Sequence, residues 1–350
     1  MRKLKVAIIG HFGGNENILD GQTVKTKILY EELSAHTDWR IKKVDTYYKK
    51  RNPVKLLMQT IAALISTRNV IVLLSGNGMK FYFPLLNLVS KVFRTRVYHD
   101  VIGGNLDFYI RNNPKFVKYL NNFAANWVET DQLKKRVESC GVKNCEVIPN
   151  FKRLTILPES AIRTEENGPF RFCTFSRVMK EKGIEDAIAA VEEINSEAGE
   201  AVCTLDIYGL IDKGYKERFS KVMGAVTPCV QYKGVVPFDR SVEAIKDYYA
   251  LLFPTRWDGE GFPGTIIDAY SAGLPVIATD WNCNGEIIQN KENGILYPNK
   301  ELQSLKESMK WLMEHMDIQK QMRRCCVQSA ELYQPDPYVQ HMVKVISERN

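Results

Sequence analysis

The sequence predicts an α/β protein built from two Rossmann-like parallel-sheet domains in tandem. Short, fully apolar runs of strand length alternate with runs of helical spacing along the chain, a pattern typical of parallel strands covered by helices on both faces. The chain has 350 residues, more than one ordinary core accommodates. A polar, proline-containing stretch around 151–169 interrupts the alternation. We therefore expect the interdomain linker there, between domains at 1–153 and 154–335.

The strands of the first domain are read from its apolar runs. They are KVAIIG (5–10), NVIVLLSG (69–76), RVYHDVIGG (96–104), the start of 123–142 and CEVIPN (145–150). Residues 23–36 have helical spacing, and the helix within 123–142 is expected to end at Gly141.

The alternation restarts after the linker. Strands are predicted at 170–176, 201–209, 229–234, 250–255 and 273–280, with helices at 184–197 and 241–249. A Pro-x-Pro break within 331–350 precedes a final helix pattern. We expect that helix, 336–350, to return to the first domain.

Composition indicates a soluble globular protein, with 45% apolar and 25% charged residues. No apolar run approaches the roughly 20 residues of a spanning helix, and the basic start reads as a first strand and not as a signal peptide. The eight cysteines form no C-x-x-C pair. We expect reduced, buried thiols in a cytoplasmic protein and no metal site.

The charge is distributed unevenly between the two halves. Residues 1–153 carry 26 Lys/Arg and 12 Asp/Glu, a net charge of +14, whereas residues 154–350 carry 22 and 29, a net charge of −7. Basic domains meet nucleic acid, anionic lipid or phosphorylated ligands, although a solvated lysine-rich face is an equal alternative. Two stretches, 49–68 and 79–96, mix cations with apolar residues and could lie on an anionic membrane surface.

Ligands of open parallel sheets bind at the carboxyl ends of the strands, so the residues after each strand are site candidates. Gly13, Gly14 and Gly21 follow the first strand, where backbone N–H groups could approach a phosphate; a plain flexible loop is the alternative. Arg177 and Lys182 follow the strand at 170–176 and suit a diphosphate leaving group, unless they are ordinary surface cations.

His99 lies toward the end of the strand predicted within 96–104, and Asp100 follows it directly. A histidine at a strand's carboxyl end can hydrogen-bond a substrate hydroxyl or carbonyl. A structural histidine inside the domain is the competing interpretation. His11, in the first glycine loop, could face the same cleft.

The stretch GEGFPGTIIDAYSAGLPVIATD (259–280) places two acids around a turn broken by Gly and Pro. Glu260 lies in the turn, and a helix is expected to begin near Thr265 with free N–H groups for phosphate oxygens. Thr265 and Asp268 also have the spacing of a capping box, which would make Asp268 a helix cap. A cap explains neither Glu260 nor the glycines, so the stretch as a whole predicts ligand binding.

These motifs together resemble the family-4 type of retaining glycosyltransferases of bacterial polysaccharide biosynthesis. The matching pieces occur in the family's order and cover most of the chain: the glycine loop, HD (99–100), VIPN (147–150), SRVMKEKG (176–183), LDIYG (205–209), VQYKGVV (230–236) and FPTRWDGEGFPGTIIDAYSAGLPVIATD (253–280). The resemblance implies the GT-B fold, with two Rossmann-like domains facing a central cleft. The first domain would bind the acceptor and the second the nucleotide sugar.

The resemblance also implies roles for individual residues. Glu260 and Asp268 match the two acids of the family's E-x7-E motif, which hold the donor sugar and the ribose; aspartate replaces the second glutamate and reaches one methylene less. Arg177 and Lys182 match the pair that clamps the diphosphate, and His99 matches the histidine near the transferred sugar. Other implied binding positions are Phe262, Gly264 and Thr265 at the diphosphate and Tyr232 to Val235 at the base.

The implied reaction is a retaining sugar transfer of the EC 2.4 class, with the diphosphate as the expected proton acceptor. No D-x-D motif is present, so neither metal nor cofactor is expected. A UDP-sugar is the favoured donor, and the acceptor is a saccharide or lipid-linked sugar of cell-surface polysaccharide assembly. The enzyme would be cytoplasmic, with peripheral contact at the inner face of the cell membrane. A nucleotide-sugar epimerase of the same fold, or a nucleic-acid-binding protein, is the alternative.

Overall fold

Twelve strands form two separate parallel sheets in the computed structural model, which describes residues 3–16, 20–162, 168–298 and 301–348. The chain divides into two units. The first unit comprises Met1–Asn150, Gly259–Phe262 and Pro335–Asn350, and the second comprises Phe151–Asp258 and Pro263–Gln334. The predicted α/β class with two parallel sheets is confirmed.

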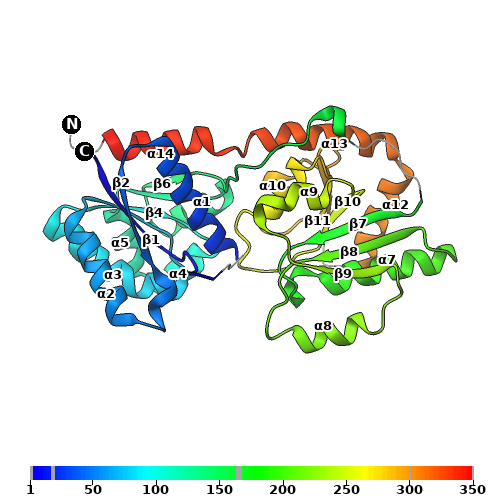
Figure 1. The fold of residues 1–350 in the computed structure, drawn as a ribbon, viewed down its shortest axis with the longest axis horizontal. Coiled ribbons are helices and arrows are strands. Elements are labelled where there is room, and N and C mark those ends of the chain that lie inside the picture. The colour runs from blue at the N-terminus through cyan, green and yellow to red at the C-terminus, as the bar shows by residue number, and fades with distance from the viewer. Residues whose placement is uncertain (1–2, 17–19, 163–167, 299–300, 349–350) are drawn as a thin grey trace. The chain divides into compact units, whose positions relative to one another are not determined.

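The sheet of the first unit, whose strands are drawn in blue to blue-green in Figure 1, has the order β2-β1-β3-β4-β5-β6. Its strands are β1 (Lys5–Gly10), β2 (Arg40–Asp45), β3 (Asn69–Val72), β4 (Arg96–Asp100), β5 (Ala125–Val128) and β6 (Cys145–Val147). Its helices are α1 (Gly21–His36), α2 (Pro53–Ser66), α3 (Gly76–Phe93), α4 (Leu106–Asn112), α5 (Lys115–Asn122), α6 (Asp131–Ser139) and α14 (Pro335–Glu348), with the 3-10 turn η1 (Thr46–Lys49).

The connections of this sheet change direction after β2. The chain steps from β1 outward to β2 and then returns to β3 on the other side of β1. Because parallel crossovers are right-handed, α1 covers one face of the sheet while α2 and α3 cover the other. The C-terminal helix α14 lies beside α1, where the His36 ring contacts the Asp336 carboxylate at 2.8 Å. Strands β1 and β3, in the middle of the sheet, are almost entirely buried.

The sheet of the second unit has the order β12-β11-β10-β7-β8-β9. Its strands are β7 (Phe170–Phe175), β8 (Cys203–Tyr208), β9 (Val230–Gly234), β10 (Ala250–Phe253), β11 (Val276–Thr279) and β12 (Gly294–Tyr297). Its helices are α7 (Ile184–Ala198), α8 (Lys216–Met223), α9 (Ser241–Ile245), α10 (Gly264–Ser271), α11 (Asn284–Ile287), α12 (Leu302–Glu314) and α13 (Met316–Glu331), with the turns η2 (Glu159–Ala161), η3 (Lys180–Lys182) and η4 (Phe238–Arg240).

The direction of winding reverses between β7 and β10. The chain runs outward from β7 through β8 to β9, then crosses back to β10 and continues to β12 on the other side. The crevice at the carboxyl ends of the two strands at such a reversal is the usual ligand position in open α/β sheets. In this unit, the reversal places the residues after β7 and after β10 at the same edge.

Two features differ from the sequence expectations. The first unit ends at Asn150 instead of residue 153, and residues 163–167 of the expected linker lie outside the described residues. Residues 259–262 were assigned to the second domain but pack with the first unit. No helix in the described part of the chain combines the length and apolar composition that crossing a membrane requires.

Candidate functional site

The start of α10 lies at the end of β7 in the second unit. The Thr265 hydroxyl donates a 2.5 Å hydrogen bond to the carbonyl oxygen of Phe175, the last residue of β7. Pro263 occupies the N-cap position and provides no side-chain hydrogen bond to the helix. The first turn, which includes Gly264, therefore keeps N–H groups without a side-chain cap, a favourable position for an anion.

Two cations follow β7 at the same edge. The Arg177 side chain is partly exposed and lies 3.9 Å from the Asp212 carboxylate. Lys182 is buried, and its ammonium lies 5.2 Å and 5.1 Å from the ring centroids of Phe253 and Trp257. Phe253 ends β10, so Lys182 spans from the β7 side to the β10 side of the reversal. The structure thus places both predicted cations at the edge where α10 begins.

Residue 183, which follows Lys182 at this junction, must be glycine for two reasons. Its φ is +69°, in the left-handed region. A Cβ atom here would also clash with the carbonyl oxygen of Pro254, just after β10. Only glycine meets both conditions, so the chain can turn directly from Lys182 into α7.

Asp268 forms a buried ion pair and not a helix cap. Its carboxylate accepts a 2.6 Å hydrogen bond from the Lys152 ammonium and a 2.8 Å hydrogen bond from the Ser241 hydroxyl. The N-cap of α10 is Pro263 and the Thr265 hydroxyl faces β7, so the capping-box interpretation is wrong. The predicted ribose contact stays a prediction, since Asp268 is only 2% exposed and both of its oxygens already have partners.

The segment predicted to meet the base lies at β9. The Tyr232 hydroxyl donates a 2.9 Å hydrogen bond to the carbonyl oxygen of Gly209, which follows β8. Val235, one residue beyond β9, is exposed. Both residues therefore lie at the carboxyl edge of the sheet, on the β8–β9 side.

The glycine loop of the first unit is held by an acid that sequence reasoning missed. Asp45, at the end of β2, accepts 2.8 Å hydrogen bonds from the backbone N–H groups of Phe12 and Gly14. Gly13 and Gly14 have φ values of +86° and +60°. The predicted phosphate contact of this loop must therefore use N–H groups other than these two.

The helix after that loop also begins with an acid. Helix α1 starts at Gly21, not near Thr23, and the Asp20 carboxylate accepts hydrogen bonds from both the N–H and the hydroxyl of Thr23. His11 contacts the same hydroxyl at 2.7 Å. Asp20 thus satisfies part of the N-terminus of α1, directly after the loop whose glycines were expected to approach a phosphate.

The glycines around Glu260 have a packing role within the first unit. The N–H of Gly104 donates a 3.4 Å hydrogen bond to the carbonyl oxygen of Gly259. A Cβ on Gly104 would clash with the Glu260 carbonyl oxygen, and one on Gly261 would lie 2.8 Å from the Cα of Gly103. The absence of side chains lets the two backbones lie against each other. Glu260 itself is 7% exposed.

A buried charged cluster of Lys25, Asp100 and Glu129 supports this loop. The Lys25 ammonium, from α1, lies 2.8 Å from Asp100 at the end of β4 and 2.9 Å from Glu129 just after β5. The other oxygen of Glu129 accepts a 3.0 Å hydrogen bond from the backbone N–H of Phe262. The predicted diphosphate contact at Phe262 therefore cannot use this N–H, which already has a partner.

The two neighbouring acids keep the Lys25 ammonium protonated. Burial lowers the pKa of Lys25, but the charges of Asp100 and Glu129 outweigh burial, so its pKa is raised. Burial raises the pKa of Asp100, which disfavours its charged form, and the Phe262 N–H adds a further donor to the Glu129 carboxylate. Nothing in the sequence indicated this cluster, because Lys25 and Glu129 belong to no motif and only their charge marks them.

His99 is placed away from any solvent-accessible surface, which does not support its predicted sugar contact. It is 0% exposed, and its ring packs edge-to-face against Phe83 and Phe123 at centroid distances of 5.0 and 6.4 Å. Burial lowers the pKa of His99 to about 3, so the ring is neutral. The structural interpretation of His99 fits this placement, and its predicted sugar contact stays a prediction.

Part of the chain is similar in sequence to known glycosyltransferases. Residues 169–315 match the family described as "Glycosyl transferases group 1". The amylovoran biosynthesis glycosyltransferase AmsK of Erwinia amylovora is 27% identical over 163 residues, which is 45% of this chain and 40% of AmsK. The chain spans less than two thirds of the curated relatives it matches.

Solved structures show the same fold over the whole chain. Sucrose-phosphate synthase from Thermosynechococcus elongatus has a TM-score of 0.78 at 14% identity, with 99% of each chain covered. Anabaena Alr3699/HepE, in complex with UDP-glucose, has a TM-score of 0.74 at 12% identity, with 99% of this chain and 100% of that chain covered. The two sheets and their helices thus have the GT-B fold. Within that fold class, residues 169–315, all in the second unit, are similar to the group 1 glycosyltransferases.

Proposed function

We propose that this protein transfers a sugar from a nucleotide-diphosphate donor to a saccharide or lipid-linked acceptor, with retention of anomeric configuration. One observation carries the proposal. The α10 start, which lacks a side-chain cap, is fastened to the end of β7 by Thr265, at the reversal point of the second sheet. Arg177 and Lys182 follow β7 at that edge. Two cations and a helix N-terminus together suit a diphosphate.

The two cations would stabilise the leaving group. As the bond between the anomeric carbon and the diphosphate breaks, negative charge builds up on the phosphate oxygens. A buried ammonium such as that of Lys182 acts more strongly on this charge than an exposed one, because less water screens it. Arg177 offers a planar group with several donors for the same oxygens.

The acceptor hydroxyl would attack the sugar from the face that the diphosphate leaves. A bond forms between the acceptor oxygen and the anomeric carbon, and the acceptor proton passes to a diphosphate oxygen. Glu260 would hold hydroxyls of the donor sugar. Its loop is fixed by the Glu129–Phe262 hydrogen bond and by backbone packing on Gly103 and Gly104.

The substrates are proposed by analogy. The HepE structure contains UDP-glucose, which supports a UDP-sugar donor here. AmsK is named for amylovoran biosynthesis, which supports a role in assembling a surface polysaccharide. The basic first unit would hold the acceptor at the inner face of the membrane.

A donor panel tests this proposal directly. The purified protein is incubated with UDP-, GDP- and ADP-sugars, and hydrolysis and product formation with lipid-linked and soluble saccharides are followed by mass spectrometry. We expect turnover with a UDP-sugar and its loss in Glu260→Ala. Full transfer activity in Glu260→Ala would refute the role of that residue, and failure with every nucleotide sugar would refute the function.

A further inference from the structure

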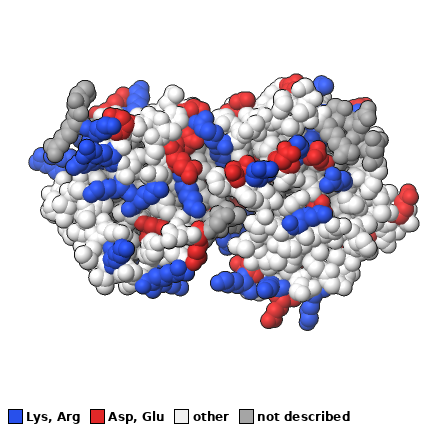
Figure 2. Space-filling view, viewed as in Figure 1, with Lys and Arg blue, Asp and Glu red and all other residues white. Residues whose placement is uncertain are grey.

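Residues 46–99 contain nine Lys/Arg and no Asp or Glu. This acid-free segment forms η1, α2, β3, α3 and all of β4 except Asp100. On the visible face of the first unit, Lys and Arg side chains predominate over Asp and Glu (Figure 2). Such a segment attracts anions over a wide surface, because no carboxylate within it neutralises the cations.

Helix α2 presents an apolar stripe to the outside. Val54, Met58, Ile61 and Ile65 are spaced by three or four residues and are 43% to 67% exposed. The opposite face, with Leu56, Ala63 and Leu64, is buried in the core of the unit. The helix is therefore apolar on both faces, although only one of them is needed for folding.

Helix α3 repeats the pattern beside α2. Phe81, Leu88 and Val92 follow helical spacing on its outer face and are 57% to 62% exposed. The Thr60 and Tyr82 hydroxyls join the two helices at 3.2 Å. The two stripes thus belong to neighbouring helices on one side of the sheet, and exposed apolar surface of this extent marks an interaction site.

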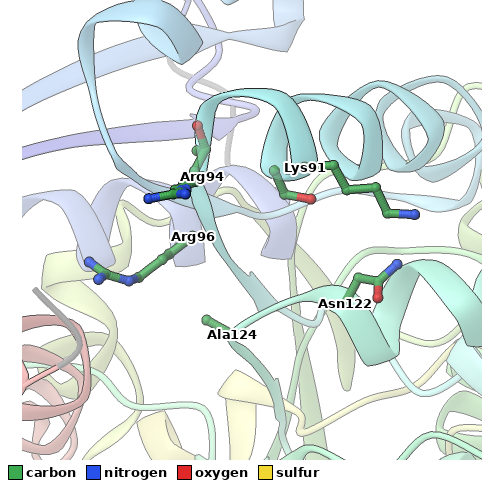
Figure 3. Close-up of a pocket in the computed structure, with 7 residues that line it drawn as sticks. Lys91, Arg94, Arg96, Asn122 and Ala124 are labelled. Atoms are coloured by element: carbon green, nitrogen blue, oxygen red, sulfur yellow. The ribbon is translucent and has the colours of Figure 1, made fainter.

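A basic pocket opens at the end of α3. Its volume is about 560 Å³, and Lys91, Arg94, Arg96 and Asn122 are among the residues that line it. Arg94 and Arg96 extend in the same direction, whereas Lys91 extends toward the side of Asn122 (Figure 3). The pocket therefore offers cationic groups on two sides.

The pocket carries two signs of an unfilled binding role. Lys91 and Arg94 have no ion-pair partner among the described residues, and the φ of +54° at Arg94 belongs to the left-handed C-cap that ends α3. Thr95, which also lines the pocket, is buried, and its hydroxyl has no hydrogen-bond partner in the described part of the chain. Two unpaired cations and an unsatisfied hydroxyl at one site of the described chain favour an anionic ligand.

The pocket lies away from the edge that carries Glu129 and the Glu260 loop. Thr95 precedes β4 and Ala124 precedes β5, so the pocket is at the amino edge of the first sheet. Asp100 and Glu129 lie at the opposite, carboxyl edge. The diphosphate site proposed above consists of residues of the second unit, so an anion bound in this pocket of the first unit would be a different ligand.

We propose that the α2–α3 surface docks on an anionic phospholipid bilayer, with a lipid headgroup phosphate in the Lys91–Arg94–Arg96 pocket. The stripes of α2 and α3 enter the boundary between headgroups and acyl chains, as amphipathic interfacial helices do. This inference deepens the membrane contact in the proposed function and rests on that part of it.

The positive charge of the α2–α3 surface favours an anionic bilayer, and not a second copy of this chain, as its partner. Two such surfaces stacked on each other would bring cations against cations, since the segment contains no acid. An anionic leaflet attracts each Lys or Arg near its surface and accepts the apolar stripes at the same time.

Vesicle flotation tests the docking without any donor or acceptor present. Phosphatidylcholine vesicles with and without phosphatidylglycerol are mixed with the wild type, with Lys91→Gln/Arg94→Gln, and with the control Lys115→Gln/Lys118→Gln on α5. We expect the wild type to bind phosphatidylglycerol vesicles and the pocket variant to bind about 30-fold more weakly, whereas the control keeps most binding. Equal losses in both variants would overturn the pocket assignment.

Two further variants separate docking from folding. Arg94→Gly relieves the positive φ, so we expect thermal stability equal to or above wild type together with weaker vesicle binding. Met58→Ser/Leu88→Ser should weaken binding at least about tenfold, while Leu210→Ser/Leu332→Ser in the second unit should not. Absence of wild-type binding, or a stripe-dependent dimer in light scattering, would overturn the proposal. Nucleotide-sugar turnover measured separately shows whether the catalytic proposal stands in either case.

Discussion

Replacing Asp268 by alanine should destabilise the second unit strongly. In the structure this carboxylate lies in the interior, bonded to the Lys152 ammonium at 2.6 Å and the Ser241 hydroxyl at 2.8 Å. Both Asp268 and Lys152 are buried. Asp268→Ala would leave a buried ammonium and a hydroxyl without their shared acceptor.

The size of the stability loss distinguishes a buried ion pair from a helix cap. Removing one partner of a buried ion pair costs about 3–5 kcal/mol, whereas removing a capping side chain costs about 1 kcal/mol. The structure therefore predicts a loss of about 3–5 kcal/mol for Asp268→Ala. Lys152→Met alone should also destabilise, because it leaves a buried carboxylate.

Urea unfolding of the single and double variants measures the coupling. We expect Asp268→Ala/Lys152→Met to lose much less than the sum of the two single losses. Asp280→Ala, at an exposed acid just after β11, serves as the control and should change stability by less than about 0.5 kcal/mol. Strict additivity, or a loss near 1 kcal/mol for Asp268→Ala, would refute the buried-pair account.

Three further predictions concern local geometry and charge. Gly183→Ala should cost more than about 2 kcal/mol, whereas Gly199→Ala, at a similar positive φ but in open space, should cost only about 1 kcal/mol in thermal unfolding. The hydrogen bond to Asp336 raises the pKa of His36, so the protonated ring contributes its full share to the free energy of unfolding below pH 6.5. That contribution is lost as the pH rises through the raised pKa, and unfolding of the His36→Gln variant should lack this pH-dependent decline. Glu129→Ala should lower the transfer rate with nucleotide affinity unchanged, since it releases the loop that carries Glu260; a matching loss of nucleotide affinity would contradict this.

The sequence predicted the central strands well because they are buried on both faces. Runs such as 5–10 and 69–76 are apolar without interruption, and they became β1 and β3. Sequence reasoning missed β2 and β12, the outer strands of their sheets. The β2 sequence, RIKKVD, is largely exposed and polar, so it lacks the pattern that marks a strand.

The cations of the candidate site were predictable because they follow a strand directly. Arg177 and Lys182 come after β7, and the parallel topology alone brings them to the carboxyl edge. The acids behaved differently. Asp268 has the sequence spacing of a cap, yet its partner Lys152 is 116 residues away in sequence. A single sequence contains no signal for such a pairing.

The packing of two glycines and of His99 could not be predicted from the sequence for a related reason. Gly259 and Gly261 suggested a backbone open to phosphate, but they lie against Gly103 and Gly104 in the first unit. His99 lies toward the end of a strand, yet the direction in which its side chain points depends on the pleat and on Phe83 and Phe123. Contacts between distant segments decide both outcomes, and local patterns do not contain them.

The central claim is that the edge formed by β7, β10 and the start of α10 binds the diphosphate of a nucleotide sugar. Calorimetric titration of UDP into the wild type, Lys182→Gln and the exposed-cation control Lys213→Gln tests it most directly. The account predicts binding to wild type and control, and at least about tenfold weaker binding to Lys182→Gln, as expected for loss of a charge-assisted contact. Equal UDP affinity in Lys182→Gln and wild type would contradict the account.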